Sequence, residues 1–397
     1  MNFLTFERRH PVNLTTKTLK KTLNKTLLAA AAALATTAAL ADVTIGVSLS
    51  LTGPGSGLGI PMQNQFKLFP STIGGEKVNL IILDDATDPG KGTTNARRFV
   101  TEDKVDMIIG SCITTVAAAM TPVATEAKTV QLAGSPVGVP PGQDQWLFRL
   151  PQSNNVMAFA MIEHMKKQGI KTVGFLGYTD AYGEQWLQAF TPEATKAGIK
   201  VVATERFART DTSVTAQALK LTAAKPDAML IVASGSGAAM PHKAVIERGF
   251  TGKVYQTHAA ATKDLMRVGG KDVEGSFVVS GPAVVGNLLP DSHPSKKVAM
   301  DFVAKYDKAY GAGSHNQFAG HSYDAQIVLE KIIPMALKKA KPGTPEFRAA
   351  LRDAMETMGR TVFSHGIMNW TKDDHWGYTN ETGVMLRVAN GDFVLAN

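Results

Sequence analysis

Short runs of β-branched and other apolar residues alternate with helical stretches between residues 42 and 281. The run Met229–Val232 is apolar at every position, which is typical of a strand buried on both faces of a parallel sheet. This alternation predicts an α/β fold in which helices cover parallel sheets. We expect strands at Val43–Leu51, Val78–Leu83, Met107–Ile109, Val130–Ala133, Thr172–Leu176, Lys200–Ala203, Ala228–Val232, Val254–Gln256 and Phe277–Val279.

The helical stretches show apolar residues spaced by three and four positions. In one segment these are Val156, Phe159, Ala160, Ile162 and Met165, and in another they are Phe347, Leu351 and Met355. Side chains that accept hydrogen bonds mark the expected starts of helices, such as Ser153 and Asp211.

The alternation forms two series, about 42–150 and 151–281, and a long helical stretch, 295–358, follows them. The tail, 366–397, is punctuated by Gly and Asn and has the character of hairpin strands. A chain of 397 residues is long enough for about two domains.

We therefore expect two lobes joined by three crossings of the chain. The first lobe combines 42–150 with 282–365, and the second combines 151–281 with 366–397. The crossings fall near Leu150-Pro151, Gly281-Pro282 and Ser364–Gly366, and three strands of chain make a hinge rather than a flexible tether. The alternative is one large domain with insertions.

Residues 1–41 have the parts of a secretory signal peptide. A positive flank that ends at Lys25 precedes the uncharged run Leu27–Leu40, and Ala39-Leu40-Ala41 supplies small residues for cleavage after Ala41. The 14-residue run is shorter than the ~20 residues that a membrane-spanning helix needs. We expect a cleaved signal and a mature protein in the periplasm.

The net charge of +8 lies mainly in this leader. Residues 42–397 carry 36 basic and 33 acidic residues and show no basic stripe, which argues against a nucleic-acid partner. The single cysteine, Cys112, excludes an intramolecular disulfide and has no neighbouring His or Lys to lower its pKa, so we expect a buried residue rather than a nucleophile.

No motif for a cofactor, a metal or catalysis is complete in the sequence. The loop Gly53–Gly59 has Leu58 where a dinucleotide-binding loop needs its third glycine, so we expect a tight loop that lets the backbone approach a ligand. Asp84, Asp85 and Asp88 follow a strand and are interpreted as helix caps rather than catalytic acids. The nine histidines lack metal-binding spacing, and no nucleophile and base come together. We expect no metal, no cofactor and no enzymatic activity.

The loop Gly110–Thr115 carries the clearest sign of a binding site. It follows a buried strand and opens an Ala-rich helix at Val116–Ala127, whose free amides and positive dipole end form an anion site. The segment Ala133–Val137 also ends a strand in small residues, and ligands of open α/β sheets bind at such carboxyl ends.

Several stretches, in this order, resemble the periplasmic binding proteins of the leucine/isoleucine/valine type. They are Ser50–Pro54, Asp84–Pro89, Ile109-Gly110 with the Thr114 loop, Tyr182–Glu184, His321–Asp324 and Asn369-Trp370. The resemblance covers nearly the whole mature chain. It implies a two-lobed type I binding protein, each lobe a parallel sheet flanked by helices, that closes on its ligand by a hinge movement.

The resemblance also implies which residues line the cleft. It assigns Leu58, Thr114, Ser135 and Val137 to the first lobe, Tyr182, Ser234 and His258 to the second lobe, and Phe318 to the returning segment. In the family, the hydroxyl at the Thr114 position and amides near 135–137 hold the ligand carboxylate. Since Pro136 has no N–H, Val137 is expected to donate.

The ligand remains open among three classes. His258 stands where amino-acid binders carry a carboxylate for the ligand ammonium, and a buried neutral imidazole is a poor partner for a cation. The segments Thr257–Ala259 and Asp374–Gly377 are similar to the subset of the family that takes up aromatic acids, in which Tyr182 and Phe318 would sandwich a ring. We favour an aromatic acid over a branched-chain amino acid, with other small acids or amides as the third class.

The expected function is that of the extracytoplasmic solute-binding component of an ABC importer, with a membrane permease as its partner. The alternative is a sensor that passes lobe closure to a receptor or regulator, which would share every cleft residue.

Overall fold

The computed structural model describes residue 1 and residues 42–396. Apart from Met1, the predicted signal peptide and its cleavage after Ala41 lie outside this described part. Within it, the longest apolar helices fall short of what crossing a lipid bilayer requires.

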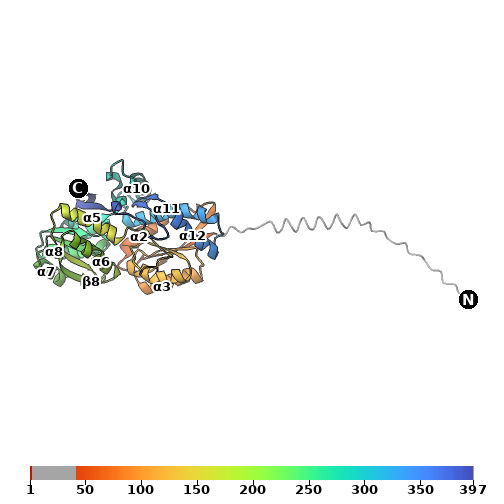
Figure 1. The fold of residues 1–397 in the computed structure, drawn as a ribbon, viewed down its shortest axis with the longest axis horizontal. Coiled ribbons are helices and arrows are strands. Elements are labelled where there is room, and N and C mark those ends of the chain that lie inside the picture. Colours follow the sequence, from red (N-terminus) through yellow and green to blue (C-terminus); the bar gives the residue numbers. More distant parts are fainter. Residues whose placement is uncertain (2–41, 397) are drawn as a thin grey trace. The chain divides into compact units, whose positions relative to one another are not determined.

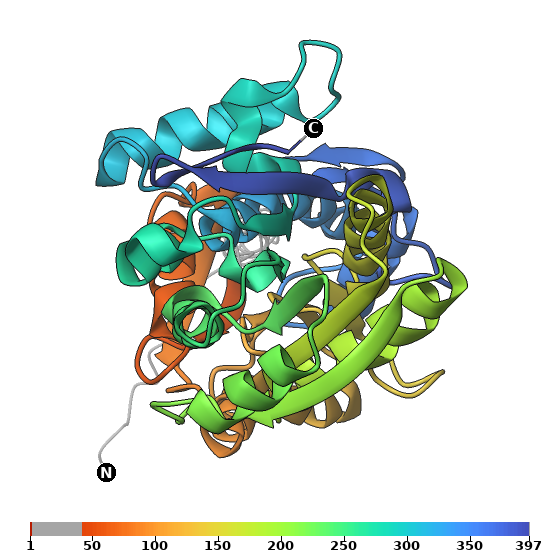
Figure 2. The ribbon, with the colours of Figure 1, turned by 90° about the vertical axis from the view of Figure 1, so that its left-hand side faces the viewer.

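Two main sheets organise residues 42–396 (Figures 1 and 2). The first has the strand order β2-β3-β1-β4-β5-β6, and only the short edge strand β2 runs antiparallel to its neighbour. Its strands are β1 (Val43–Leu49), β2 (Thr72–Ile73), β3 (Glu76–Asp84), β4 (Met107–Gly110), β5 (Val130–Ala133) and β6 (Leu147–Arg149).

The second sheet has the order β15-β14-β11-β10-β9-β7-β8, with an antiparallel hairpin, β14–β15, added at one edge of five parallel strands. Its strands are β7 (Thr172–Tyr178), β8 (Lys200–Phe207), β9 (Ala228–Val232), β10 (Lys253–Gln256), β11 (Phe277–Ser280), β14 (Val384–Ala389) and β15 (Asp392–Leu395). A separate pair joins β12 (Thr361–Phe363) to β13 (Gly366–Met368). The sheets are thus parallel in their centres and mixed at their edges.

Helices cover both sheets, as the alternation of the sequence predicts. They are α2 (Ser56–Phe66), α3 (Pro89–Thr101), α4 (Thr114–Glu126), α5 (Asn154–Lys167), α6 (Ala181–Lys196), α7 (Thr215–Ala223), α8 (Ala239–Glu247), α9 (Lys263–Gly269), α10 (Lys296–Tyr310), α11 (Gln317–Leu337) and α12 (Pro345–Thr357). In Figure 1, α6, α7 and α8 surround one sheet, whereas α3 and α12 lie by the other.

The returning segment packs on the first sheet although it follows the second one in sequence. Helix α11 packs along α2 and contacts β2, and α12 contacts β5. The chain thus passes from β6 to the second sheet, returns after β11 to the first, and goes back from β13 to β14. The residues at which each lobe begins and ends stay a prediction.

All nine expected strands are present. Some, such as β4 and β9, are fully buried apolar runs, whereas β3 and β8 are mostly only partly buried. The strands β2, β6 and β12 escaped it, since they are only two or three residues long. The expected helices at Ser153 and around Phe347 are confirmed, and Ser153 accepts a hydrogen bond from the Val156 amide.

Two expectations about acidic residues were wrong. Asp211 does not start a helix: α7 begins at Thr215, and Asp211 instead accepts a hydrogen bond from the Ala208 amide within its loop. Among the acids after β3, only Asp88 caps a helix, accepting from the Lys91 amide at the start of α3. Asp84 ties its turn to the end of β1, and Asp85 is buried among serine hydroxyls.

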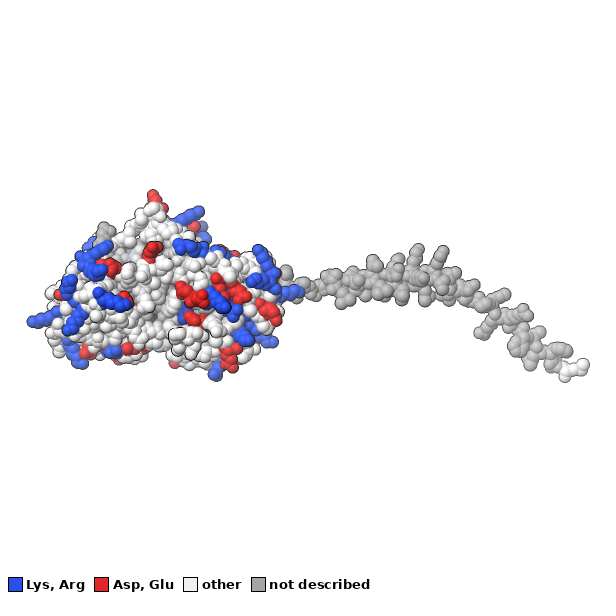
Figure 3. All heavy atoms as spheres, in the orientation of Figure 1, with Lys and Arg blue, Asp and Glu red and all other residues white. Residues whose placement is uncertain are grey.

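On the face drawn in Figure 3, basic and acidic side chains are interspersed over the described residues. This distribution agrees with the small net charge that remains once the leader is set aside.

Candidate ligand-binding pocket

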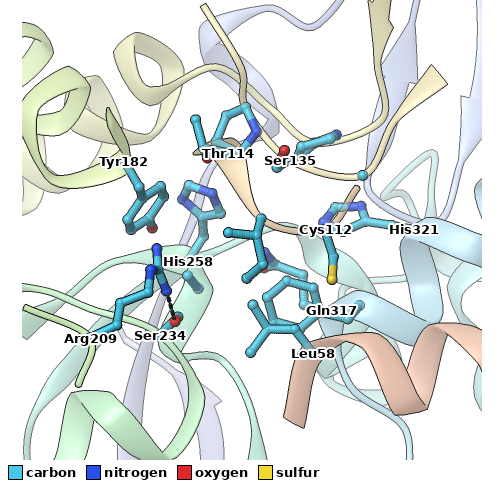
Figure 4. A pocket seen from close by; sticks show the side chains of 16 residues that line it. Leu58, Cys112, Thr114, Ser135, Tyr182, Arg209, Ser234, His258, Gln317 and His321 are labelled. Atoms are coloured by element: carbon cyan, nitrogen blue, oxygen red, sulfur yellow. Dashed lines mark hydrogen bonds between the residues drawn. The ribbon is translucent and has the colours of Figure 1, made fainter. Parts of the chain in front are cut away.

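The carboxyl ends of strands from both sheets meet at one pocket (Figure 4). The loops after β4 and β5 line it from the first sheet, and the segments after β7, β8, β9 and β10 line it from the second. Helices α2 and α11 complete the lining.

The start of α4 supplies the first part of the wall. Ile113 is the residue before the helix, and no side chain of the described residues caps the first amides. The Ala117 amide donates to the Ile113 carbonyl, so the amides of Thr114, Thr115 and Val116 precede the first bonded amide of α4. These amides and the positive end of the helix dipole favour an acceptor or an anion.

The loop after β5 brings Ser135 to the same wall. The Ser135 side chain is buried, and its Oγ has no hydrogen-bond partner among the described residues. Val137 differs: its amide donates to the Ser135 carbonyl at 2.8 Å, and its side chain packs with Ala117, Ala133 and Leu147. The amide that the sequence analysis assigned to the ligand is therefore used inside the loop, and Val137 is not part of the pocket lining.

Two glycines place the helices that carry Leu58 and Tyr182. A Cβ on Gly59 would lie 2.1 Å from the Ser50 carbonyl oxygen, and one on Gly183 would lie 1.9 Å from that of Tyr178. Without side chains at these positions, α2 and α6 approach the ends of their preceding strands closely. The adjacent residues, Leu58 and Tyr182, then line the pocket.

Arg209, in the loop after β8, brings a cation to the second wall. Its Nε donates to Asp180 at 2.5 Å, its Nη1 donates to Ser234 Oγ at 2.9 Å, and the guanidinium lies 4.1 Å from the centre of the Tyr178 ring. The other Asp180 oxygen accepts from the first amides of α6. These contacts hold the guanidinium in place and leave further N–H groups for a ligand, since arginine carries five donors.

Tyr182 and His258 form an aromatic part of the same wall. The Tyr182 hydroxyl donates to Thr257 Oγ1 at 2.8 Å, so it has no hydrogen left to donate to a ligand acceptor. The His258 ring lies 6.0 Å from the Tyr182 ring and 5.7 Å from the Trp186 ring. Burial, assisted by the charge of His365, lowers the pKa of His258 to about 3, which keeps this imidazole neutral at physiological pH.

Helix α11 adds Gln317, Phe318 and His321. The Gln317 Oε1 accepts from Ser280, whereas its Nε2 and the His321 Nδ1 are buried without a hydrogen-bond partner among the described residues. Burial first, and then the nearby imidazoles of His365 and His258, lower the pKa of His321 well below its ordinary value. In Figure 4, His321 and Cys112 lie across the pocket from Arg209 and Tyr182.

The lining residues contain one formal charge, that of Arg209, and no Asp or Glu. Cys112 adds none, because burial, together with the negative charge of Asp85, raises the pKa of its thiol to about 12. It is a buried residue, as expected. Within the described residues, no group of acidic, histidine and cysteine side chains is arranged to hold a metal ion.

The pocket brings together seven of the eight residues assigned from the sequence: Leu58, Thr114, Ser135, Tyr182, Ser234, His258 and Phe318. Sequence reasoning missed Arg209, which sits in a loop without periodicity, and Gln317. It named His321 only as part of a family motif. His375 and Trp376 pack elsewhere, on Phe148 and Arg149.

Comparisons with known proteins agree with this architecture. The family model described as "Periplasmic binding protein" matches residues 42–391. A protein named Leu/Ile/Val-binding protein homolog 3, from Brucella melitensis, is 25% identical over 263 residues, which cover 63% of this chain and 70% of the relative.

Two solved structures are similar over most of the chain. An extracellular ligand-binding receptor from Rhodopseudomonas palustris is 45% identical, covers 90% of this chain and 99% of its own, and has a TM-score of 0.88. A solute-binding protein of an ABC transporter from R. palustris, solved with benzoate, is 19% identical, covers 90% of this chain and 96% of its own, and shows the shared fold with a TM-score of 0.76. With its two helix-covered sheets and the matched residues 42–391, this chain belongs to the periplasmic binding protein family, a family of solute-binding proteins.

Proposed function

We propose that this protein is the solute-binding component of an ABC importer and that it takes a small organic carboxylate between its two lobes. The observation that carries the proposal is the charge of the pocket lining, which is a single fixed cation, Arg209, without an acidic residue. An amino acid would bring an ammonium group to a pocket that offers it no carboxylate. Burying a charged group, such as this ammonium, without an oppositely charged partner costs roughly several kcal/mol.

The acid group of the ligand lies between the two walls in this proposal. One carboxylate oxygen accepts from the amides and the hydroxyl at Thr114, and the other accepts from Arg209. Because these donors belong to different sheets, the ligand stabilises the closed arrangement through contacts that the open one lacks. The closed form is then the form that a membrane permease recognises.

The remainder of the ligand extends toward Gln317 and His321. Both side chains have a buried polar atom without a partner among the described residues, so a ligand hydroxyl or carbonyl at this end would satisfy them. Between the two ends, the rings of Tyr182, His258 and Phe318 line the pocket and favour a flat aromatic body. The benzoate complex of a protein with the same fold supports this ligand class.

Binding to purified mature protein tests the proposal. Isothermal titration calorimetry with benzoate and 4-hydroxybenzoate should show saturable binding, and 4-hydroxybenzoate should bind more tightly because its hydroxyl reaches the α11 end. Benzamide is the matched control, since it keeps the shape of benzoate without the negative charge. It should bind at least about tenfold more weakly, which corresponds to about 1.4 kcal/mol.

Leucine provides the opposing ligand. Equal binding of benzoate and benzamide, or tight binding of leucine without binding of either acid, would overturn the proposed ligand class. Co-purification with an ABC permease that depends on added ligand would support the transport role. Capture of a receptor instead, with no permease bound, would oppose it.

A further inference from the structure

Two of the chain's crossings between the sheets meet at one buried residue, His365, and the third crossing follows it in sequence. Gln152, just after the first crossing, donates from its Nε2 to the His365 carbonyl at 2.8 Å. Gly281, at the second crossing, lies so close that a Cβ there would be 2.5 Å from His365 Cδ2. His365 itself lies in the turn between β12 and β13, the strand pair from which the chain goes on to β14 in the second sheet.

The His365 ring is fully buried and closely surrounded by neighbouring residues. Its Nδ1 lies 2.8 Å from Asp324 Oδ2, and both side chains are almost fully buried. A Cβ on Gly320, in the first turns of α11, would lie 2.6 Å from His365 Cε1. The ring thus occupies the space that Gly281 and Gly320 leave free, and Asp324 orients it.

The same ring is connected to the ligand pocket. It stacks on the ring of His321, with centroids 4.1 Å apart and an angle of 21° between the planes. His321 lines the pocket. His321 thus joins the pocket lining to the residue at which two crossings meet.

We propose that His365 is the pivot of the interlobe hinge, a positioning residue that sets the balance between the open and the closed arrangement. This inference rests on the proposed binding function in that closure accompanies ligand uptake. Tightly packed elements switch between discrete arrangements rather than deforming continuously. A residue in contact with two crossings, and placed just before the third, constrains which arrangements are allowed and thereby the fraction of binding-competent protein.

Distances between spin labels test the pivot without depending on the ligand. Labels at Lys91→Cys on α3 and Leu219→Cys on α7 report the separation of the two sheets, and both positions are exposed. Cys112 does not interfere, because it is buried and its thiol pKa is raised to about 12. Pulsed electron–electron double resonance then gives the distribution of label–label distances in the ligand-free protein and in the presence of benzoate.

Gly281→Ala is the main variant. The backbone at Gly281, with φ −78° and ψ 162°, suits any residue, so the added methyl group acts mainly by displacing His365 and Gln152. We expect a shifted ligand-free distance distribution and a change of about tenfold in the Kd of benzoate, as a shift in the competent population produces. His365→Ala should also shift the distribution, and in the double variant the methyl group should add less than it does alone, because the ring is gone and only the close approach to Gln152 Nε2, at 2.9 Å, remains.

His164→Ala and Gly286→Ala are the matched controls. His164 is a buried histidine bonded to Tyr255 within the second sheet's own layers, and a Cβ on Gly286 would press on Ala299. Both should lower thermal stability and leave the distances unchanged. If Gly281→Ala gives the wild-type distribution, or if the controls shift it equally, His365 is an ordinary core residue and the pivot is wrong. Failure of the wild type to bind benzoate would instead count against the proposed ligand class alone.

Discussion

The two walls of the pocket offer different kinds of polar group to a ligand. The first-sheet wall uses backbone amides at the start of α4 and neutral groups such as Ser135, so it accepts any group with lone pairs. The second-sheet wall uses a side-chain cation, Arg209, fixed by Asp180 and Ser234. In the proposed binding mode this difference means that the first wall provides attachment, whereas the second wall selects for negative charge.

Removing the cation of the second wall should have the largest effect on binding. We expect Arg209→Ala to raise the Kd of an aromatic acid about 100-fold, equivalent to about 2.7 kcal/mol, since a charged donor to a buried carboxylate is lost. Calorimetry measures the change. Arg209→Lys is the matched control, because it keeps the charge on a flexible stem and should recover part of the affinity.

A Kd for the alanine variant within about threefold of the wild type would break the comparison. The charge of the second wall would then have no part in selection, and the amides of α4 would hold the acid alone.

The neutral histidines of the pocket should make stability depend on pH. The pKa of His258 is lowered to about 3 in the folded protein, whereas an unfolded histidine titrates near its ordinary value of 6.5. The unfolded chain therefore binds more protons as pH falls below 6.5, and stability is lost progressively toward pH 3 by at most about 1.4 kcal/mol per pH unit for such a group.

Urea unfolding at pH 7.5 and pH 5.5 measures this loss. In His258→Gln the loss between the two pH values should be smaller, because the substituted side chain does not titrate. An identical pH dependence in the variant and the wild type would show that His258 is not a buried neutral group.

The hydroxyl of the first wall should contribute less than Arg209. Thr114→Ala should weaken binding of an aromatic acid about fivefold, since one neutral hydrogen bond of about 1 kcal/mol is removed while the helix amides remain. Thr114→Ser keeps the hydroxyl and should stay near the wild-type Kd. A larger loss for Thr114→Ala than for Arg209→Ala would reverse the roles that we give to the two walls.

The smallest effect is expected for Tyr182→Phe. The hydroxyl of Tyr182 already donates to Thr257 and has no hydrogen left to donate to the ligand, so we expect the ring to matter more. The Kd should change by less than about twofold, and Tyr182→Leu, which removes the ring, should weaken binding of an aromatic acid more. A strong loss in the phenylalanine variant would mean that the hydroxyl turns to the ligand.

Much of the fold was predictable because fully buried strands appear in the sequence as short runs of consecutive apolar residues. The run at Ala228–Val232 is such a case, and every one of its residues is buried in the centre of the second sheet. Strands of two or three residues, such as β2, are too short to show an apolar pattern in the sequence. The strand β2 is defined by its pairing with β3.

The pocket was predictable where a helix starts directly after a buried strand, as at Thr114. It was not predictable where a residue owes its place to contacts distant in sequence. Arg209 is held at the pocket by its hydrogen bonds to Asp180 and Ser234. Val137 lies outside the pocket lining, and its amide donates to the Ser135 carbonyl within the same loop.

A crystal structure of the mature protein with its bound acid tests the central claim most directly. We predict that the carboxylate lies between the amides at the start of α4 and the Arg209 guanidinium, with the rest of the molecule directed toward His321. A ligand whose carboxylate lies away from Arg209, or one that carries an ammonium group toward His258, would contradict the account.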